Sequence, residues 1–370
     1  MKILSKSKKQ KKPQTASERF SSAVRNGVMT ECEGRMYAAL RESVPLLDAA
    51  IEKIVRLCGG FKVKCSNKTA ERLLARFLRD VPFGASQRGI DAFVASTLDR
   101  MLTYGTAVNE MLIDGEGRLC ALYGADLGAV ELREGAPAKP RIFLKGINEQ
   151  EIPHPERVIV TARNPEPHSP YGTSLLRGLP FLSRILLGIY ESVGVNFERM
   201  GNLRFAVTYR PGNGEYAPSC AEEIASAWSS AMNDSSAVRD FVAVGDVDIK
   251  VIGADCAMPD IDVPVRTILE QITSKTGLPP FLLGLCWSST ERMSSQQADI
   301  LTSELEYYRG LVAPAILIIC REYLKGEGIY EDVSIEWDEI SLQDETELAR
   351  ARLYNAQAEK IEREMRGEKE

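Results

Sequence analysis

The spacing of apolar residues predicts that the chain begins with helices. Apolar positions recur every three or four residues from Met29 to Cys58, which is the period of an amphipathic helix, and two glycines follow. Residues 61–65 alternate between apolar and charged side chains, as a half-buried strand does. The helical period then returns over roughly residues 67–80 and 87–104.

Short strands predominate in the next part of the chain. Residues 108–113 and 119–123 are predicted strands joined by a glycine-containing turn, which is typical of a hairpin. Further short apolar runs, separated by glycine and proline, lie at 130–132, 141–144 and 158–160. This mixture of helices and short strands predicts the α+β class.

A small insertion separates two predicted helices. The first runs from about Leu175 to Met200 with an apolar stripe along one side, and the second covers residues 262–277. The segment between them contains strand-like and helical pieces, at 205–209, 222–232, 241–244 and 247–252. We interpret it as a small α+β excursion.

A polar loop and a long helix are predicted next. Gly277, followed by two prolines, ends the preceding helix. Residues 285–293 are rich in hydroxyl groups and have no regular period, which predicts an exposed loop. Ser294 and Gln297 have the spacing of a capping box, so we expect the long helix to begin there.

The long helix contains a proline. Its apolar residues form one continuous face, at Leu301, Leu305, Tyr308, Val312, Ala315, Ile319 and Tyr323. Pro314 removes one backbone hydrogen bond and clashes with the carbonyl of Gly310, at a cost of about 3 kcal/mol. We therefore predict a helix kink at Gly310 and Pro314.

Composition predicts a soluble protein with an acidic body. The chain has 370 residues, 44% hydrophobic and 26% charged, and a net charge of −6, although six lysines lie within its first twelve residues. Residues 1–27 are predicted to be a disordered basic tail, which either contacts nucleic acid or an acidic partner or is simply solvated. No apolar run approaches the ~20 residues that a membrane span requires.

The sequence offers no motif for catalysis or metal binding. It has neither a phosphate-binding loop nor a dinucleotide-binding glycine motif. Both histidines, His154 and His168, lie in proline-rich turns, and the eight cysteines include no C-x-x-C pair. Ser289 lies near Lys275 in the sequence, but no nucleophile motif surrounds it. We therefore predict no catalytic residue, no metal site and no cofactor.

Two motifs carry a family resemblance. Residues 168–174 read His-Ser-Pro-Tyr-Gly-Thr-Ser and precede a long helix, and residues 272–284 read Ile-Thr-Ser-Lys-Thr-Gly-Leu-Pro-Pro-Phe-Leu-Leu-Gly. A Ser/Thr-rich loop and a helix containing Pro314 follow. In this order the motifs resemble the portal proteins of tailed bacteriophages, the siphophage-like family of head–tail connector rings, from about Tyr37 to about Trp337.

The resemblance implies a structural protein and not an enzyme. Such proteins form a ring, usually of twelve subunits, at one capsid vertex, and double-stranded DNA is packaged and ejected through it. The implied partners are other copies of the chain, the DNA, the terminase large subunit, the head–tail adaptor, and the major capsid and scaffolding proteins, with no membrane involved. The implied location is the portal vertex of the virion, and the host cytoplasm during assembly.

The resemblance also implies a division of the chain. After the tail 1–27 come a mixed α/β wing (28–178), a stem helix (179–200), a clip (201–261), a second stem helix (262–277), a tunnel loop region (278–294), a kinked helix with more of the wing (295–337), and a short helical crown (338–370). The tunnel loop facing DNA would comprise Trp287, Ser288, Ser289, Thr290, Glu291, Arg292 and Met293. Lys275 and Arg292 would be the residues best placed to touch phosphate.

An acidic body suits a channel through which DNA must slide. Each phosphate that the protein neutralises releases counterions and raises the affinity for DNA, so we expect a strongly basic lining to slow the movement of DNA.

Two other functional classes stay open at this stage. A non-specific DNA-binding protein would act through the lysine-rich tail, and binding would vanish when residues 1–12 are deleted. An uncharacterised hydrolase would lose activity when Ser289 or His168 is changed. The portal hypothesis predicts instead a large closed ring with repeating head-to-tail contacts.

Overall fold

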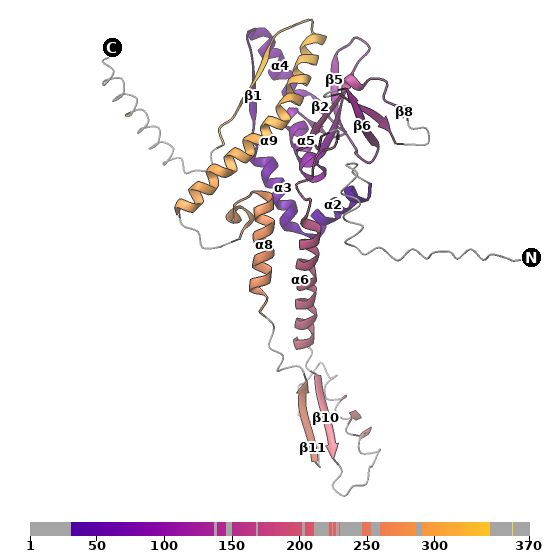
Figure 1. Ribbon diagram of the computed structural model, residues 1–370, viewed down its shortest axis with the longest axis vertical. Helices are drawn as coiled ribbons and strands as arrows, with labels where there is room; N and C mark the ends of the chain where they lie inside the picture. The colour runs from indigo at the N-terminus through magenta and orange to yellow at the C-terminus, as the bar shows by residue number, and fades with distance from the viewer. Residues whose placement is uncertain are drawn as a thin grey trace, which may run out of the picture. The chain divides into compact units, whose positions relative to one another are not determined.

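The chain divides into two units, which are described separately (Figure 1). The computed structural model describes residues 31–136, 139–145, 150–167, 169–201, 204–210, 222–223, 225–226, 229, 246–252, 260–285, 291–340 and 357. Unit 1 comprises residues 1–183 and 268–370, and unit 2 comprises residues 184–267. The boundaries between the units fall inside two helices, α6 (Leu179–Gly201) and α8 (Asp262–Thr276).

Unit 1 begins with two helices where the sequence pattern predicted one. α2 covers Glu31–Ser43 and α3 covers Pro45–Leu57. Val44 separates them with φ −124° and ψ 89°. A residue that precedes proline is pushed out of the helical conformation by the proline ring, so Pro45 starts a new helix. The apolar period continues across this break because both helices bury their apolar faces.

A five-stranded sheet and the helix α5 form the core of unit 1. The strand order is β3 (Gln87–Arg88), β2 (Pro82–Phe83), β5 (Leu119–Ala125), β4 (Thr106–Ile113) and β9 (Val158–Ala162). The hairpin predicted from the sequence is confirmed, since β4 and β5 pair antiparallel with Met111 opposite Leu122. α5 (Ile90–Tyr104) contacts β4 and buries Phe93 and Met101 completely.

Two smaller sheets complete unit 1. β6 (Val130–Ala136), β7 (Lys139–Leu144) and β8 (Gln150–Glu151) form an antiparallel sheet. β1 (Phe61–Cys65) pairs with β12 (Val333–Trp337), a strand that the sequence analysis did not single out. The Phe61 and Trp337 rings lie 5.1 Å apart at the end of this ribbon.

Buried Arg309 joins the ribbon to the helices. α9 (Glu291–Gly326) carries Arg309, whose Nε donates a 2.7 Å hydrogen bond to the Cys58 carbonyl at the end of α3. Its guanidinium group also lies 5.1 Å from the Trp337 ring centroid. α4 (Lys68–Asp80) contacts α9 as well, with the Phe77 and Tyr323 rings stacked at 3.9 Å. The long helix is therefore anchored at several points of unit 1.

Two predicted helix starts are corrected by the structure. α6 begins at Leu179 and not near Leu175, because the Leu175 amide donates to the Leu102 carbonyl and Gly178 has φ 92°, which no α-helix accommodates. α9 begins at Glu291, one turn before the capping-box residue Ser294.

Unit 2 contains a hairpin-like pair of strands. β10 (Arg204–Arg210) and β11 (Asp246–Ile252) pair antiparallel, with Val207 opposite Ile249. Both strands were predicted from their alternating pattern. The predicted strand at 241–244 and most of the helical piece at 222–232 lie outside the described residues. So do the basic tail 1–27 and most of the crown 338–370.

No helix within the described ranges combines the length and apolar character that crossing a bilayer requires.

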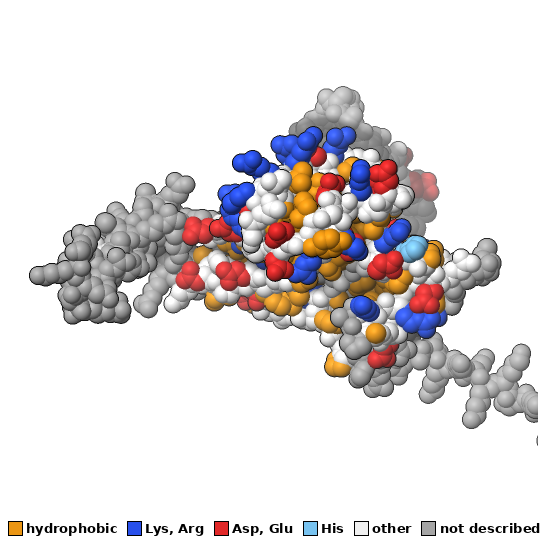
Figure 2. Space-filling view, turned by 90° about the horizontal axis from the view of Figure 1, so that it is seen from above, with side chains coloured by type: hydrophobic (Ala, Val, Ile, Leu, Met, Phe, Trp, Pro, Cys, Tyr) orange, Lys and Arg blue, Asp and Glu red, His pale blue; other side chains and the backbone are white. Residues whose placement is uncertain are grey.

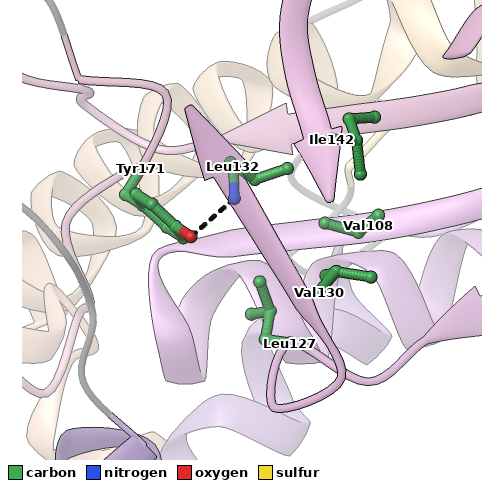
Figure 3. Close-up of a cluster of buried hydrophobic side chains, with 6 residues drawn as sticks. All are labelled: Val108, Leu127, Val130, Leu132, Ile142 and Tyr171. Atoms are coloured by element: carbon green, nitrogen blue, oxygen red, sulfur yellow. Dashed lines mark hydrogen bonds between the residues drawn. The ribbon is translucent and has the colours of Figure 1, made fainter. Parts of the chain in front are cut away.

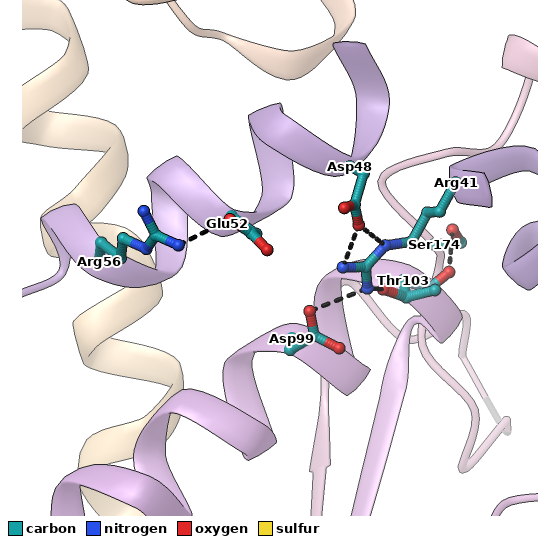
Figure 4. Close-up of polar contacts among 7 residues, drawn as sticks. All are labelled: Arg41, Asp48, Glu52, Arg56, Asp99, Thr103 and Ser174. Atoms are coloured by element: carbon teal, nitrogen blue, oxygen red, sulfur yellow. Dashed lines mark hydrogen bonds and ion pairs between the residues drawn. The ribbon is translucent and has the colours of Figure 1, made fainter. Parts of the chain in front are cut away.

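Arg41 joins the helices α2, α3 and α5 of unit 1 (Figure 4). From α2 it donates hydrogen bonds of 2.8 Å to Asp48 on α3 and to Asp99 on α5, and a third of 2.8 Å to the Thr103 hydroxyl. Its side chain is only 17% exposed, whereas Arg56, which pairs with Glu52 on the same helix, is 76% exposed. The Arg41 guanidinium group is therefore largely shielded from water, although its partners Asp48 and Asp99 are 43% and 37% exposed, whereas Arg56 is not shielded.

We expect Arg41→Gln to lower the free energy of unfolding of the protein by roughly 1–3 kcal/mol, because it leaves Asp48 and Asp99 without their shared cation. Arg56→Gln is the matched control, and as an exposed pair it should change stability by less than about 1 kcal/mol. Urea unfolding followed by circular dichroism measures both. Equal effects of the two substitutions would contradict the structural role of Arg41.

Candidate functional site

The predicted tunnel loop falls into two parts. Trp287, Ser288, Ser289 and Thr290 lie outside the described residues. Glu291, Arg292 and Met293 belong to the first turn of α9, so the expectation that they are loop residues is wrong. Hydroxyl-rich sequence predicts loop poorly at a helix N-terminus, since Ser and Thr are also the residues that start helices.

Lys275 lies in the last turn of α8, where a cation is favourable at the negative end of the helix dipole. Gly277 ends this helix with φ 71°, as the sequence predicted, and its amide donates to the Thr273 carbonyl at 3.0 Å. Burial, and then the neighbouring guanidinium groups of Arg163 and Arg177, lower the pKa of the Lys275 ammonium group. Lys275 is therefore one of three neighbouring cations in unit 1.

We call Arg163, Arg177 and Lys275 the basic cluster. Arg163 Nη1 donates to the Thr173 carbonyl at 3.1 Å, and its buried Nε has no hydrogen-bond partner among the described residues. Arg177 contacts Glu166 at 3.5 Å, with both side chains about half exposed, a pair that contributes little stability. The positive charges of Arg163 and Arg177 disfavour the charged form of Lys275, so an anion bound among them would relieve that repulsion.

Sequence reasoning found Lys275 but missed the two arginines. Arg163 and Arg177 come from the segment 163–178 that joins β9 to α6, which we call the lead-in segment. Its side chains meet α8 only through the tertiary fold, and no motif spacing marks them. The side chain of Arg292, the other predicted phosphate contact, lies outside the description.

The Ser-Pro-Tyr-Gly motif fixes the lead-in segment to the core (Figure 3). The Tyr171 ring is buried against Leu132, Val108 and Ile142, and its hydroxyl accepts a 2.8 Å hydrogen bond from the Leu132 amide. The Ser174 hydroxyl donates to the Thr103 carbonyl at 2.6 Å. The motif that carries the family resemblance thus acts structurally, by setting where α6 begins.

Gly172 permits a close approach of two backbones. Its amide donates to the Thr106 hydroxyl at 2.8 Å. A Cβ atom at this position would lie 2.2 Å from the Gly105 carbonyl oxygen and 2.5 Å from the Arg163 amide nitrogen. Gly105, on the other side of the contact, has φ 85° and ends α5. Position 172 requires glycine because a side chain there would overlap backbone atoms. Position 105 requires glycine because its φ is positive.

α9 packs on the same lead-in segment. The Tyr307 hydroxyl donates a 2.5 Å hydrogen bond to Asn164 Oδ1, and the buried Tyr308 hydroxyl is hydrogen-bonded to the Arg163 side chain. Burial raises the pKa of Tyr308, so this hydroxyl stays neutral near neutral pH. Asn164 is the described non-glycine residue with a positive φ, 45°, a conformation that asparagine tolerates. The basic cluster is therefore held by contacts from α9.

Gly310 and Pro314 lie on the exposed side of α9. The helix is continuous through Pro314, and its ribbon bends along its length in Figure 1. Exposure on one side suits a bend away from solvent, because helices curve with their convex side toward water. Whether the bend serves function stays a prediction.

α6 exposes large apolar side chains within unit 2. Tyr190, Val195 and Phe197 are 49%, 43% and 60% exposed. A groove of about 350 Å³ runs along the helix, lined by Ile185, Gly188, Ile189, Ser192, Val193, Asn196 and Ile261. Exposed apolar surface of this kind marks an interaction site in a soluble protein. Of these three residues only Phe197 belongs to the apolar stripe that the sequence predicted, and another member of that stripe, Leu186, is buried.

The described part of the chain contains no group of three or more side chains arranged to hold a metal ion. His154 contacts Glu156 at 3.0 Å in an exposed turn, and His168 lies outside the described residues. Burial raises the pKa of the Cys58 and Cys320 thiols to about 12, which leaves both unreactive near neutral pH.

We expect Gly172→Ala to lower the free energy of unfolding by roughly 2–4 kcal/mol, because the added methyl group overlaps backbone atoms that cannot move separately. Gly115→Ala is the control, since its Cβ would meet nothing within 4 Å and its effect should stay within about 0.5 kcal/mol. Thermal and urea unfolding measure the difference. A stable Gly172→Ala protein would show that the two segments are not held this closely.

Comparisons with known proteins show the fold of the chain. No protein-family model and no curated protein matches the sequence. Among solved structures, a chain from the virion of the native gene transfer agent (GTA) particle is 15% identical, with a TM-score of 0.62, and the match covers 87% of this chain and 89% of that one. A chain from the neck of the native GTA particle, computed with C12 symmetry, is 16% identical with the same TM-score and the same coverage.

An HK97 family phage portal protein from Corynebacterium diphtheriae also matches, at 11% identity and a TM-score of 0.43, over 84% of this chain and 95% of that chain. The α+β class predicted from the sequence is confirmed, since the structure combines helices with several sheets and matches the two GTA chains over 87% of its length. This chain shares its fold with chains of the GTA particle and its neck.

Proposed function

We propose that this chain is a portal protein, a ring-forming subunit at one vertex of a capsid. The ring is the channel for packaging and ejecting double-stranded DNA, and it docks the terminase large subunit and the head–tail adaptor. The observation that carries the proposal is the fold shared, over 87% of the chain, with a chain in a particle neck computed with C12 symmetry. The two sequence motifs, in their portal-like order, support it independently.

The exposed apolar side of α6 supports assembly into a ring. Tyr190 and Phe197, seven residues apart on one face of the helix, leave apolar area open to water in the single chain, which is unfavourable unless another surface covers it. A second copy of the chain is the occupant that the ring provides. Repetition of one head-to-tail contact around an axis closes the ring. We assign α6 and α8 to the stem, residues 201–261 to the clip and most of unit 1 to the wing.

The basic cluster supports transient contact with DNA. Lys275, Arg163 and Arg177 offer a few cations in unit 1. We assign residues 286–290, together with the start of α9, to the tunnel loop. A few phosphate contacts guide DNA, whereas many would hold it. Each neutralised phosphate raises the affinity and makes it depend more steeply on salt concentration. The acidic composition of the chain suits a channel in which DNA keeps moving.

Particle averages of the purified protein in the electron microscope, together with its native mass, test the proposal. We expect a closed ring of about twelve subunits with a central hole. A protein that remains monomeric at high concentration would contradict the proposal.

Phe197→Asp is expected to prevent ring assembly and leave the subunit folded. Phe197 is 60% exposed in the single chain, so its replacement removes no core packing, but a ring would bury the new carboxylate without a partner. Glu191→Gln, at another exposed position of α6, is the control and should still assemble. Sedimentation velocity measures assembly and circular dichroism measures folding. Rings of normal mass from Phe197→Asp would show that this side of α6 is not an interface.

Pro314→Ala is expected to stabilise α9 by up to about 3 kcal/mol, since it restores a backbone hydrogen bond, and to impair DNA packaging while rings still form. Ser303→Ala, at an exposed position of the same helix, should alter neither. Thermal unfolding and packaged DNA per particle are the two measurements. Normal packaging by Pro314→Ala would show that the bend has no role in DNA passage.

A further inference from the structure

One side of α4 consists of cations. Lys68, Arg72, Arg76 and Arg79 are all exposed, and their spacing of four, four and three residues places them on one helix face. Ala70, Leu74 and Leu78 are buried on the opposite side. We call the four cations the basic face of α4. Figure 2, which looks onto the end of unit 1 where α4 lies in Figure 1, shows a row of Lys and Arg side chains along the upper left of the view.

Adjacent strands extend the positive charge. Lys62 on β1 and Arg88 on β3 are exposed, and the electrostatic effect of Arg76 and Arg88 reaches the Asp80 carboxylate at the end of α4. Lys64 on β1 is paired with Glu336 at 3.5 Å, both largely exposed. The positive surface is thus built from three elements and is wider than a single helix.

The charge on this face is only partly neutralised. Lys68 pairs with Glu71 at 3.2 Å, and Arg79 pairs with Asp80 at 2.9 Å. The side chains of Lys68 and Arg79 are 77% and 75% exposed, so water weakens both pairs. In the described part of the chain, Arg72 and Arg76 make no ion pair. Like charges four residues apart destabilise a helix by roughly 0.2–0.5 kcal/mol per pair. The protein as a whole has a net charge of −6, yet α4 carries four cations that repel one another on one face.

Nucleic acid fits this surface better than a protein partner does. Protein interfaces have an apolar or aromatic centre inside a polar rim. No large apolar side chain of residues 61–88, all of which are described, is prominently exposed. The face instead offers cations about 6 Å apart along roughly 16 Å of helix. Duplex DNA carries one charge per about 1.7 Å of its axis, so several phosphates lie within reach of such a face. Arginine guanidinium groups also bind phosphate oxygens in pairs.

We propose that the basic face of α4, with Lys62 and Arg88 beside it, binds the phosphate backbone of double-stranded DNA without reading its sequence. The inference goes beyond the portal function, because it requires neither a ring nor a channel. The basic face of α4 also differs from a channel lining in the number of cations that it presents. Four or more cations on one surface bind DNA more tightly than two or three do, because affinity rises with the number of phosphates neutralised.

The test uses Arg72→Gln/Arg76→Gln in the full chain. Covalently closed circular plasmid is the ligand, because a closed circle cannot thread through a preformed ring, and its affinity is measured as a function of salt concentration. The slope of log K against log [salt] is negative, and loss of two phosphate contacts should make it less steep by about 2. Affinity at about 0.1 M salt should fall at least tenfold, whether or not rings form.

Two controls locate the binding. Arg56→Gln/Arg141→Gln changes the net charge equally at exposed arginines elsewhere in unit 1 and should keep the native slope. A third variant replaces the six lysines among the first twelve residues by glutamine and should retain the binding that depends on Arg72 and Arg76.

Two outcomes overturn the proposal. The first is an unchanged salt slope of plasmid binding in Arg72→Gln/Arg76→Gln. If that variant also fails to assemble into particles, the basic face of α4 binds an acidic protein partner instead of DNA. The second is complete loss of binding in the tail variant alone. Unfolding midpoints within a few degrees of the native protein confirm that each variant is folded. Ring formation by these variants, scored separately, tests the portal function and not this inference.

Discussion

The contact between Gly105 and Gly172 is the constraint on which the arrangement of unit 1 depends. At this point α5 ends, β4 begins and the lead-in segment to α6 crosses both, with a separation that no side chain at position 172 permits. Tyr171 and Ser174 lock the segment on either side through hydrogen bonds to Leu132 and Thr103. A single close approach thereby sets the start of α6 and the positions of the residues around it.

The same contact organises the candidate phosphate site. Arg163 lies at one end of the lead-in segment and Arg177 near the other, and the tight crossing between them holds both near Lys275. α9 reinforces this arrangement through Tyr307 and Asn164.

Positive charge is distributed unevenly over an acidic chain. The basic cluster has three cations, one of which is paired with Glu166, whereas the basic face of α4 presents a regular row. We propose that the first arrangement contacts DNA weakly and the second binds it more tightly, because affinity rises with the number of phosphates neutralised.

The sequence by itself determined the elements whose signals are local. The β4–β5 hairpin, the end of α8 at Gly277 and the strands β10 and β11 followed from turn chemistry and periodicity, which depend only on neighbouring residues. The tertiary structure alone decided the pairing of β1 with β12. It also decided which cations gather around Lys275. These features depend on contacts between segments far apart in the chain, and no local pattern encodes such contacts.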